Sequence, residues 1–286
     1  MIWLIGNKGM LGTELSNLLE KKGIPFIGTD RDVDITDLNT LNNFTKDKQI
    51  KCIVNCAAYT AVDKAEDDFE TCDRLNHLGA ANIAICSAMI PARIIHISTD
   101  YVFDGTGSAP YREDDNTNPI GVYGRTKKDG ETAVLQNNPH SYIIRTAWLY
   151  GKHGNNFVST MLKLMNERSE LKVVNDQIGN PTWAFDLANV IIKFMNTEKP
   201  AGIYHYTNEG NITWFNFANE IYKQGKKLGL IKNDCSVLPC TSSEFPAKVK
   251  RPAYSVLDKG KIKSELKVSI PSWEYSLKEY LKCLVH

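Results

Sequence analysis

Short apolar runs alternate with amphipathic stretches over the first 150 residues of the chain. Between the runs, apolar residues recur every three or four positions, as at Leu38, Leu41 and Phe44, which is the spacing of a helix that covers a core. Short continuous apolar runs are typical of strands buried on both faces of a parallel sheet. The runs lie at 2–5, 24–30, 53–59, 92–103 and 141–146. The repeated order of strand and helix predicts an α/β fold with a doubly wound parallel sheet.

The pattern changes after Gly151 and becomes irregular. The expected elements of this part are helices and strands at 155–165, 171–174, 186–194 and 202–206, and helices from residues 213 and 273. We expect a first domain of residues 1–150 with a return segment at about 183–205, and a smaller mixed α/β substrate domain of residues 151–182 and 206–286. A junction between domains is a usual place for a ligand site.

Composition and charge exclude several classes of protein. The chain has 34 basic and 33 acidic side chains and a net charge of +1, which gives no reason to expect nucleic acid or an anionic membrane as a partner. No run approaches the ~18 apolar residues of a membrane helix, and the N-terminus lacks the basic start of a signal peptide. The seven cysteines show no Cys-x-x-Cys spacing. The sequence therefore predicts a cytoplasmic protein with reduced thiols and no structural metal.

A glycine-rich loop follows the first predicted strand. Gly6, Gly9 and Gly12 are three residues apart and precede a segment with helical spacing from Thr13. In such a loop the first glycine allows a tight turn, the second lets backbone approach a pyrophosphate, and the third lets helix and strand pack closely. The spacing differs from the more common Gly-x-Gly-x-x-Gly, and an ordinary strand-to-helix turn is the alternative. We favour a Rossmann-like NAD(P)-binding domain with these glycines in its cofactor loop.

Asp30 and Arg31 come at the end of the second predicted strand, about twenty residues after the glycine loop. A carboxylate at this place accepts hydrogen bonds from the ribose hydroxyls of NAD, whereas an arginine suits the 2′-phosphate of NADP. The two signals conflict. The sequence therefore leaves the choice between NADPH and NADH open.

Tyr123 and Lys127 are four residues apart in a segment predicted to be helical, so they lie on one face, one turn apart. A nearby ammonium lowers the pKa of a tyrosine, which can then exchange a proton with a carbonyl or alcohol oxygen. Tyr-x-x-x-Lys is common by chance, and a surface pair is the alternative interpretation. The pair gains weight from Ser98, Thr99 and Asp100, which follow a strand at the sheet edge where ligands bind in open α/β sheets.

Trp148 follows the predicted strand 141–146. A tryptophan at this place either packs in the core or offers its ring as a platform for a substrate. The pattern leaves both interpretations open.

These motifs, in this order and spacing, resemble the extended short-chain dehydrogenase/reductase superfamily. More narrowly, the chain resembles the dTDP-4-dehydrorhamnose reductase family over essentially its whole length. The segments that carry the resemblance are 6–12, 55–63, 98–103, 123–127, 145–151, 154–157, 175–182 and 251–252. The resemblance implies transfer of a hydride from NADPH or NADH to C4 of dTDP-4-dehydro-L-rhamnose, which gives dTDP-L-rhamnose.

The resemblance also implies roles for the site residues. Tyr123 would donate the proton, Lys127 would lower the pKa of Tyr123 and hold the nicotinamide ribose, and Thr99 would bind the substrate carbonyl or Tyr123. Besides the three glycines, Arg31, Tyr123 and Lys127, cofactor contacts are expected from Met10, Leu11, Asp30, Asp34, Ile35, Ala57, Ala58 and Thr60. Substrate contacts are expected from Thr99, Asp100, Tyr101, Trp148, Asn156 and Arg251, with the forked donors of Arg251 at the diphosphate.

The chain departs from the family pattern at one point. Some members are dimers joined by magnesium through glutamates; Glu14 matches the first, but Asp186 stands near the second and no C-terminal glutamate corresponds to the third. A homodimer is expected, with bound magnesium in doubt.

Two other functions remain open from the sequence. One is a reductase of another nucleotide 4-keto sugar, and the other is a noncatalytic regulatory subunit that binds NADP and a nucleotide sugar. The presence of Thr99, Tyr123 and Lys127 disfavours the second, because a binding protein has no chemical need of them. A dehydratase typically has Asp-Glu after the threonine, whereas here Asp100 is followed by Tyr101.

Overall fold

The computed structural model describes residues 1–245 and 247–285. Six strands form one sheet in the order β10-β5-β4-β3-β1-β2, and every neighbouring pair is parallel. The strands are β1 (Ile2–Ile5), β2 (Phe26–Thr29), β3 (Cys52–Asn55), β4 (Arg93–Thr99), β5 (Tyr142–Thr146) and β10 (Gly202–His205). The predicted α/β class and parallel sheet are confirmed. Because β1 has β2 on one side and β3 on the other, the strand order reverses there, which is where open α/β sheets bind their ligands.

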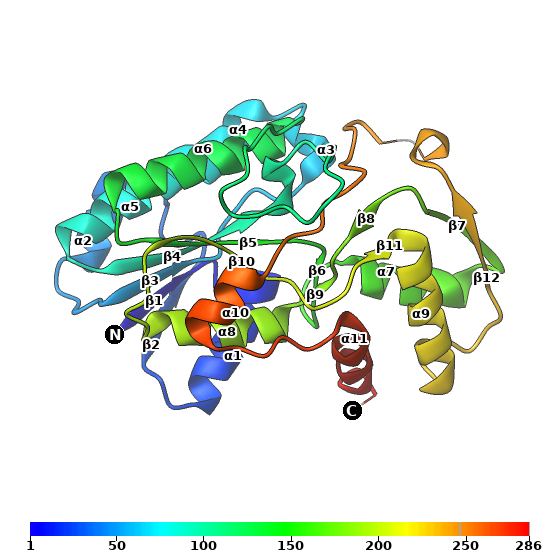
Figure 1. The fold of residues 1–286 in the computed structure, drawn as a ribbon. Helices are drawn as coiled ribbons and strands as arrows, with labels where there is room; N and C mark the ends of the chain where they lie inside the picture. Colours follow the sequence, from blue (N-terminus) through cyan, green and yellow to red (C-terminus); the bar gives the residue numbers. More distant parts are fainter. Residues whose placement is uncertain (246, 286) are drawn as a thin grey trace.

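Helices cover both faces of this sheet (Figure 1). One face carries α2 (Leu38–Thr45), α4 (Phe69–Asp73), a π-helical turn (Arg74–Leu78), α5 (Gly79–Met89) and α6 (Val122–Asn137), with the short α3 (Val62–Ala65) near its end. The other face carries α1 (Met10–Lys21), α8 (Ala184–Met195) and α10 (Gly260–Leu266). The strands are buried on both sides. Leu4 packs below the sheet, on the face that carries α1 and α8, while Trp3 and Ile5 pack above it, on the face that carries α2 and α5.

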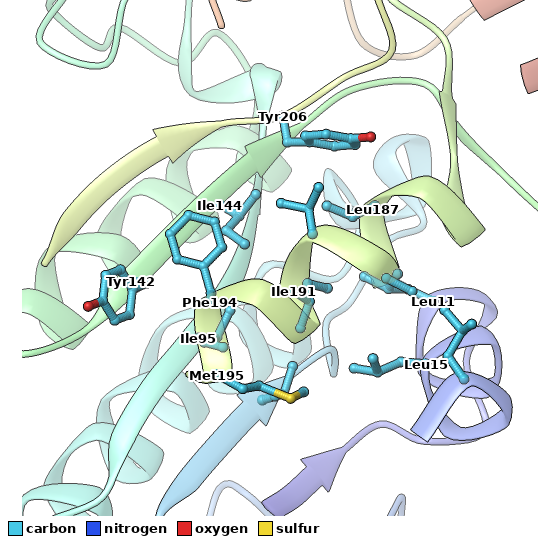
Figure 2. Packing of buried hydrophobic residues seen from close by; sticks show 14 of the residues in the cluster. Leu11, Leu15, Ile95, Tyr142, Ile144, Leu187, Ile191, Phe194, Met195 and Tyr206 are labelled. Carbon is cyan, nitrogen blue, oxygen red and sulfur yellow. The ribbon is translucent and has the colours of Figure 1, made fainter. Parts of the chain in front are cut away.

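The layer beneath the sheet is a continuous apolar cluster. Figure 2 shows Leu11 and Leu15 of α1 beside Leu187 and Ile191 of α8, with side chains of β4 and β5 against them. Leu15, Leu187 and Ile191 are fully buried. Each such side chain contributes about 1.5–3 kcal/mol relative to an exposed position. This layer fixes α1, and with it the start of the glycine loop, against the sheet.

A second lobe lies beyond the carboxyl ends of the strands (Figure 1). Its main elements are α7 (Phe157–Glu167), β7 (Glu170–Val174), α9 (Trp214–Lys227), β12 (Ser236–Cys240) and α11 (Trp273–Lys282). Three two-stranded pairs complete it: β7 with β12, β6 (Leu149–Tyr150) with β9 (Thr182–Trp183), and β8 (Ile178–Gly179) with β11 (Ile212–Thr213). Met165, Phe217 and Leu277 belong to its separate apolar core.

Two local features differ from the expected pattern. The strand expected at 92–103 ends at Thr99, and a 3₁₀ turn (Asp100–Val102) follows, capped by the Thr99 hydroxyl. The segment after Gly260, expected in the substrate domain, places Ile262 and Ile270 in the cluster beneath the sheet. None of the helices among the described residues is long and apolar enough to cross a membrane.

Candidate active site

The glycine loop is closed tightly against its neighbours. Gly6 has a φ of +75°, and a Cβ there would lie 2.7 Å from the backbone nitrogen of Ala57. A Cβ on Gly12 would lie 2.0 Å from the carbonyl oxygen of Gly6. Gly9 is the N-cap of α1 and provides no side-chain cap, so the first N–H groups of this helix are free of a capping side chain. Such a helix N-terminus suits the pyrophosphate of a dinucleotide.

The residues after β2 lie beside this loop. The Gly6 amide donates to the carbonyl of Thr29, the last residue of β2. Asp30 is half-buried and Arg31 is exposed. The carboxylate that suits NAD and the guanidinium that suits NADP therefore both lie just after β2. The carbonyl of Ile35 accepts from Asn82.

Asp34 and Ile35 are already engaged by the protein. The Asp34 carboxylate accepts hydrogen bonds from the backbone and hydroxyl of Thr36. The Ile35 side chain packs in the cluster above the sheet, against the position of Gly79. The Ile35 side chain is thus part of the core, while Asp34 is exposed and only its Oδ1 is engaged by these hydrogen bonds.

The loop after β3 is held by two buried asparagines. Asn55 accepts from the Ala57 amide (3.0 Å), and Asn76 binds both backbone groups of Tyr59, at 2.8 Å and 3.1 Å. Asn76 also donates to the Thr126 hydroxyl on α6. It therefore ties the loop that carries Ala58 and Thr60 to the helix of the catalytic pair.

The sequence interpretation did not single out Asn76. Its sequence neighbours Asp73, Arg74 and His77 are also polar, so the local pattern does not distinguish it. In the structure this residue lies in the π-helical turn, a feature often found at functional sites.

Tyr123 and Lys127 lie one turn apart on α6, as predicted. The Lys127 side chain is 2% exposed, and its Nζ donates to the carbonyl of Ile97 at 2.6 Å. Its ammonium group also lies 3.4 Å from Nε2 of His96. The lysine is thus part of the interior, and the surface-pair interpretation is wrong.

The environment of Tyr123 differs from the expectation in one respect. Burial raises the pKa of its phenol well above the usual value; the Thr99 hydroxyl opposes this shift through a hydrogen bond, and the Asp100 carboxylate adds to it. The predicted lowering by Lys127 is not found, because the ammonium group is turned to the Ile97 carbonyl. A phenol with a raised pKa keeps its proton at neutral pH, as a proton donor must.

Asp100 is a buried carboxyl next to this pair. Its Oδ1 accepts from the Thr99 hydroxyl at 3.0 Å, while its Oδ2 has no hydrogen-bond partner among the described residues. Burial raises the pKa of Asp100 to about 6. An unpaired buried polar atom of this kind is costly unless something binds to it.

Arg251 connects the second lobe to Tyr101 and Asp63, near Tyr123. It donates to the Tyr101 hydroxyl at 3.0 Å and to Asp63 at 2.8 Å, and the Tyr101 ring packs edge-on against Tyr123 with 5.4 Å between ring centroids. Arg251 also lines a cavity of about 1240 Å³ formed by α7, β7, the end of β12 and Trp214. A second cavity, of about 700 Å³, lies at the opposite edge of the sheet and contains none of these residues.

Trp148 has an unusual position between the lobes. Its backbone has a φ of +47°, which is rare for a bulky residue, and its ring stacks on Trp214 with 3.4 Å between centroids. One ring face is therefore covered by Trp214, a residue that sequence reasoning did not select. Asn156, expected to contact substrate, caps α7: its oxygen accepts from the Ser159 amide and its amide donates to the Gly151 carbonyl.

The residues considered for magnesium do not form a metal site. The Asp186 carboxylate accepts hydrogen bonds from Asn208 and Ser276 inside the protein. Glu14 is half-buried near Lys152 and His153. Across residues 1–245 and 247–285, no group of three acidic, histidine or cysteine side chains is arranged to hold a metal ion.

Comparisons with known proteins agree with this geometry. The family model described as "RmlD substrate binding domain" matches residues 1–285. A dTDP-4-dehydrorhamnose reductase of Streptomyces griseus is 39% identical and covers 99% of this chain and 93% of its own.

Two solved structures are similar over the full length. A dTDP-4-dehydrorhamnose reductase of Clostridium acetobutylicum is 42% identical, with a TM-score of 0.91 and coverage of 100% of this chain and 99% of that one. The Bacillus anthracis enzyme of the same name, in complex with NADP, is 37% identical, with a TM-score of 0.92 and coverage of 98% of each chain. The resemblance seen in the sequence is confirmed, and the chain belongs to the RmlD substrate binding domain family, together with these reductases.

Proposed function

We propose that this protein reduces dTDP-4-dehydro-L-rhamnose to dTDP-L-rhamnose with NADPH. The observation that carries the proposal is a half-buried Tyr123 beside Thr99, with the pKa of its phenol raised by burial, joined through Tyr101 and Arg251 to a cavity in the second lobe. The names of the two solved relatives, and the NADP bound to one of them, support the substrate and the cofactor.

The chain's own residues supply proton transfer and orientation. Tyr123 donates its proton to the C4 oxygen as negative charge develops there, and the Thr99 hydroxyl orients that oxygen or the phenol. The Lys127 ammonium would hold the nicotinamide ribose. NADPH, when bound, supplies the hydride.

We assign the cofactor to the crevice at the carboxyl ends of β1, β2 and β3. The pyrophosphate lies at the glycine loop with Met10 and Leu11, and Asp30 and Arg31 face the adenosine ribose. Ala57, Ala58 and Thr60 line the loop toward the nicotinamide. Arg31 favours NADPH, because its cation pairs with the 2′-phosphate.

We assign the nucleotide part of the substrate to the cavity of the second lobe. Arg251 binds the diphosphate, and Asp100, Tyr101 and Trp148 border the sugar. The division into a cofactor domain (1–150 with 183–205) and a substrate domain follows from this assignment. Asn156 supports the site indirectly by fixing the start of α7.

The test is oxidation of NADPH, and separately of NADH, on addition of dTDP-4-dehydro-L-rhamnose. Wild type should turn over, and Tyr123→Phe should lose almost all activity. Tyr275→Phe is the matched control, because Tyr275 is exposed on α11. Oxidation of the cofactor only with another nucleotide 4-keto sugar would show that the substrate is that sugar and not dTDP-4-dehydro-L-rhamnose. Tight binding of NADPH without oxidation by any such sugar would favour a regulatory subunit.

The proposal includes a homodimer that does not need magnesium. The support for the absence of magnesium is that Oδ2 of Asp186 accepts hydrogen bonds from Asn208 and Ser276 inside the protein. Sedimentation with and without EDTA should give the same mass. Dissociation of a dimer by the chelator would contradict this part of the proposal.

A further inference from the structure

A buried ion pair lies directly behind the catalytic pair. Glu131 follows Lys127 by four residues on α6, so Tyr123, Lys127 and Glu131 share one face of the helix. Glu131 binds Arg145 of β5 through two parallel hydrogen bonds, Nε to Oε1 at 2.9 Å and Nη2 to Oε2 at 2.8 Å. Both side chains are almost fully buried.

Arg145 is fixed by further contacts. Its guanidinium lies over the ring of Phe103, 5.1 Å from the centroid, and Nη1 lies 3.4 Å from Nε2 of His205. Burial lowers the pKa of His205 to about 3, so this ring is neutral and adds no charge. The arginine therefore holds the Glu131 side chain in one orientation along the helix.

The immediate neighbours of Lys127 offer its ammonium group few hydrogen-bond acceptors. The oxygen of Asn55 accepts from the Ala57 amide, so the amide nitrogen of Asn55 faces Nδ1 of His96, at 3.0 Å. That donor requires Nδ1 to be unprotonated, which places the ring proton on Nε2, toward Lys127. The ammonium thus has one acceptor, the Ile97 carbonyl, and faces an N–H group on the other side.

The titratable groups around Lys127 come from four elements. They are Glu131 on α6, His96 on β4, Cys56 after β3 and Cys72 on α4. Burial lowers the pKa of Lys127 to about 8, and Glu131 is the main charge that opposes this shift.

The other groups around Lys127 are uncharged at neutral pH. Burial raises the pKa of Cys56 to about 12 and raises that of Cys72, and burial lowers the pKa of His96 well below its usual value. Of these four groups, Glu131 is therefore the main one that can stabilise the Lys127 ammonium.

We propose that the Glu131–Arg145 pair is a positioning element for the reductase, in which Arg145 fixes the Glu131 carboxyl group one turn behind Lys127 and this group stabilises the Lys127 ammonium. The proposal rests on the function proposed above. Neither residue touches substrate or cofactor; both act through Lys127. Without the carboxyl group of Glu131, the lysine loses its proton near neutral pH and no longer offers an ammonium group to the nicotinamide ribose.

The test compares the pH dependence of kcat in wild type, Glu131→Gln and the double variant Glu131→Gln with Arg145→Met. Reduction needs both a protonated Tyr123 and a charged Lys127, so kcat falls as pH rises through the pKa of Lys127. Loss of the carboxylate should move this fall to lower pH by on the order of one unit. The double variant distinguishes the loss of the carboxyl group from a loss of stability, because it leaves no buried arginine without a partner.

Three results decide the matter. The proposal expects the double variant to regain stability relative to Glu131→Gln while it keeps the shifted pH profile. A double variant with the pH profile of wild type would show a merely structural role and overturn the proposal. Glu274→Gln, an exposed change of the same kind on α11, should behave as wild type.

A second readout does not depend on turnover. The NMR titration of Lys127, assigned with Lys127→Arg, should have a lower midpoint in the double variant than in wild type. An unchanged midpoint would overturn the inference even if the enzyme is active. Failure of wild type to oxidise NADPH would instead contradict the proposed function and leave this titration as the deciding measurement.

Discussion

Gly124 sets the distance between the catalytic helix and the end of β4. A Cβ on Gly124 would lie 2.1 Å from the carbonyl oxygen of Tyr101, whereas ordinary contact begins at 3.4 Å. Alanine at this position must therefore open the gap between α6 and the 3₁₀ turn by about 1.3 Å, the difference between these two distances. The obstructing atom is backbone and cannot rotate away. Since Tyr123 is the preceding residue, it moves with the helix.

Two energies oppose each other in Gly124→Ala. Alanine in a helix stabilises by up to about 1 kcal/mol relative to glycine. Overpacking typically costs about 1–3 kcal/mol. We expect a net loss of roughly 1–2 kcal/mol in the free energy of unfolding. A shift of about 1 Å in a catalytic group can lower the rate on the order of 100-fold, so kcat should fall far more than stability.

The assays are urea unfolding and NADPH oxidation under saturating substrate. Arg125→Ala is the control, because Arg125 is the next residue of the same helix and its side chain is exposed. It should retain the activity and stability of wild type. A Gly124→Ala protein that is more stable than wild type and has the same kcat would refute the reasoning, since the steric conflict would then not exist.

Three further predictions follow from single side chains. Leu187→Ala removes a fully buried side chain beneath the sheet and should lower the free energy of unfolding by about 2–5 kcal/mol in urea titrations; a loss below about 1 kcal/mol would contradict the packing described. Burial raises the pKa of Asp100 to about 6, so ionisation of Asp100 destabilises the fold as pH rises above its unfolded value, near 3.8. Asp100→Asn should therefore raise the free energy of unfolding by up to roughly 3 kcal/mol at about pH 8 and have little effect at about pH 4. An equal increase at the two pH values would exclude ionisation of Asp100 as the cause. Arg251→Ala should raise KM for the nucleotide sugar at least about tenfold with a smaller effect on KM for NADPH, and the reverse order would remove Arg251 from the substrate site.

The sequence predicts the main elements of the fold well because they depend on local periodicity. Apolar runs locate the strands of the central sheet, and helical spacing locates α6 and α8. The helical spacing of Leu38, Leu41 and Phe44 likewise locates α2, which the Asp37 side chain caps. It does not predict β12, whose residues are mostly exposed, or the short helix α10.

The chemistry of the site was harder to predict because it depends on contacts between distant segments. The spacing of Tyr123 and Lys127 is local and is confirmed. The pKa of Tyr123 is set instead by burial under other elements, which spacing alone does not reveal. In the same way, Asn76 and Arg145 gain their roles from partners on other elements, 17 residues away in the chain for Asn76 and 14 for Arg145.

The most direct test of the account is the fate of hydrogen in a single turnover. NADPH that carries deuterium at the transferable position should be mixed with enzyme and dTDP-4-dehydro-L-rhamnose, and the product analysed by NMR. The account predicts dTDP-L-rhamnose with deuterium at C4 of the sugar, and no such product with Tyr123→Phe. Deuterium at another carbon, or undiminished formation of the labelled product by Tyr123→Phe, would contradict it.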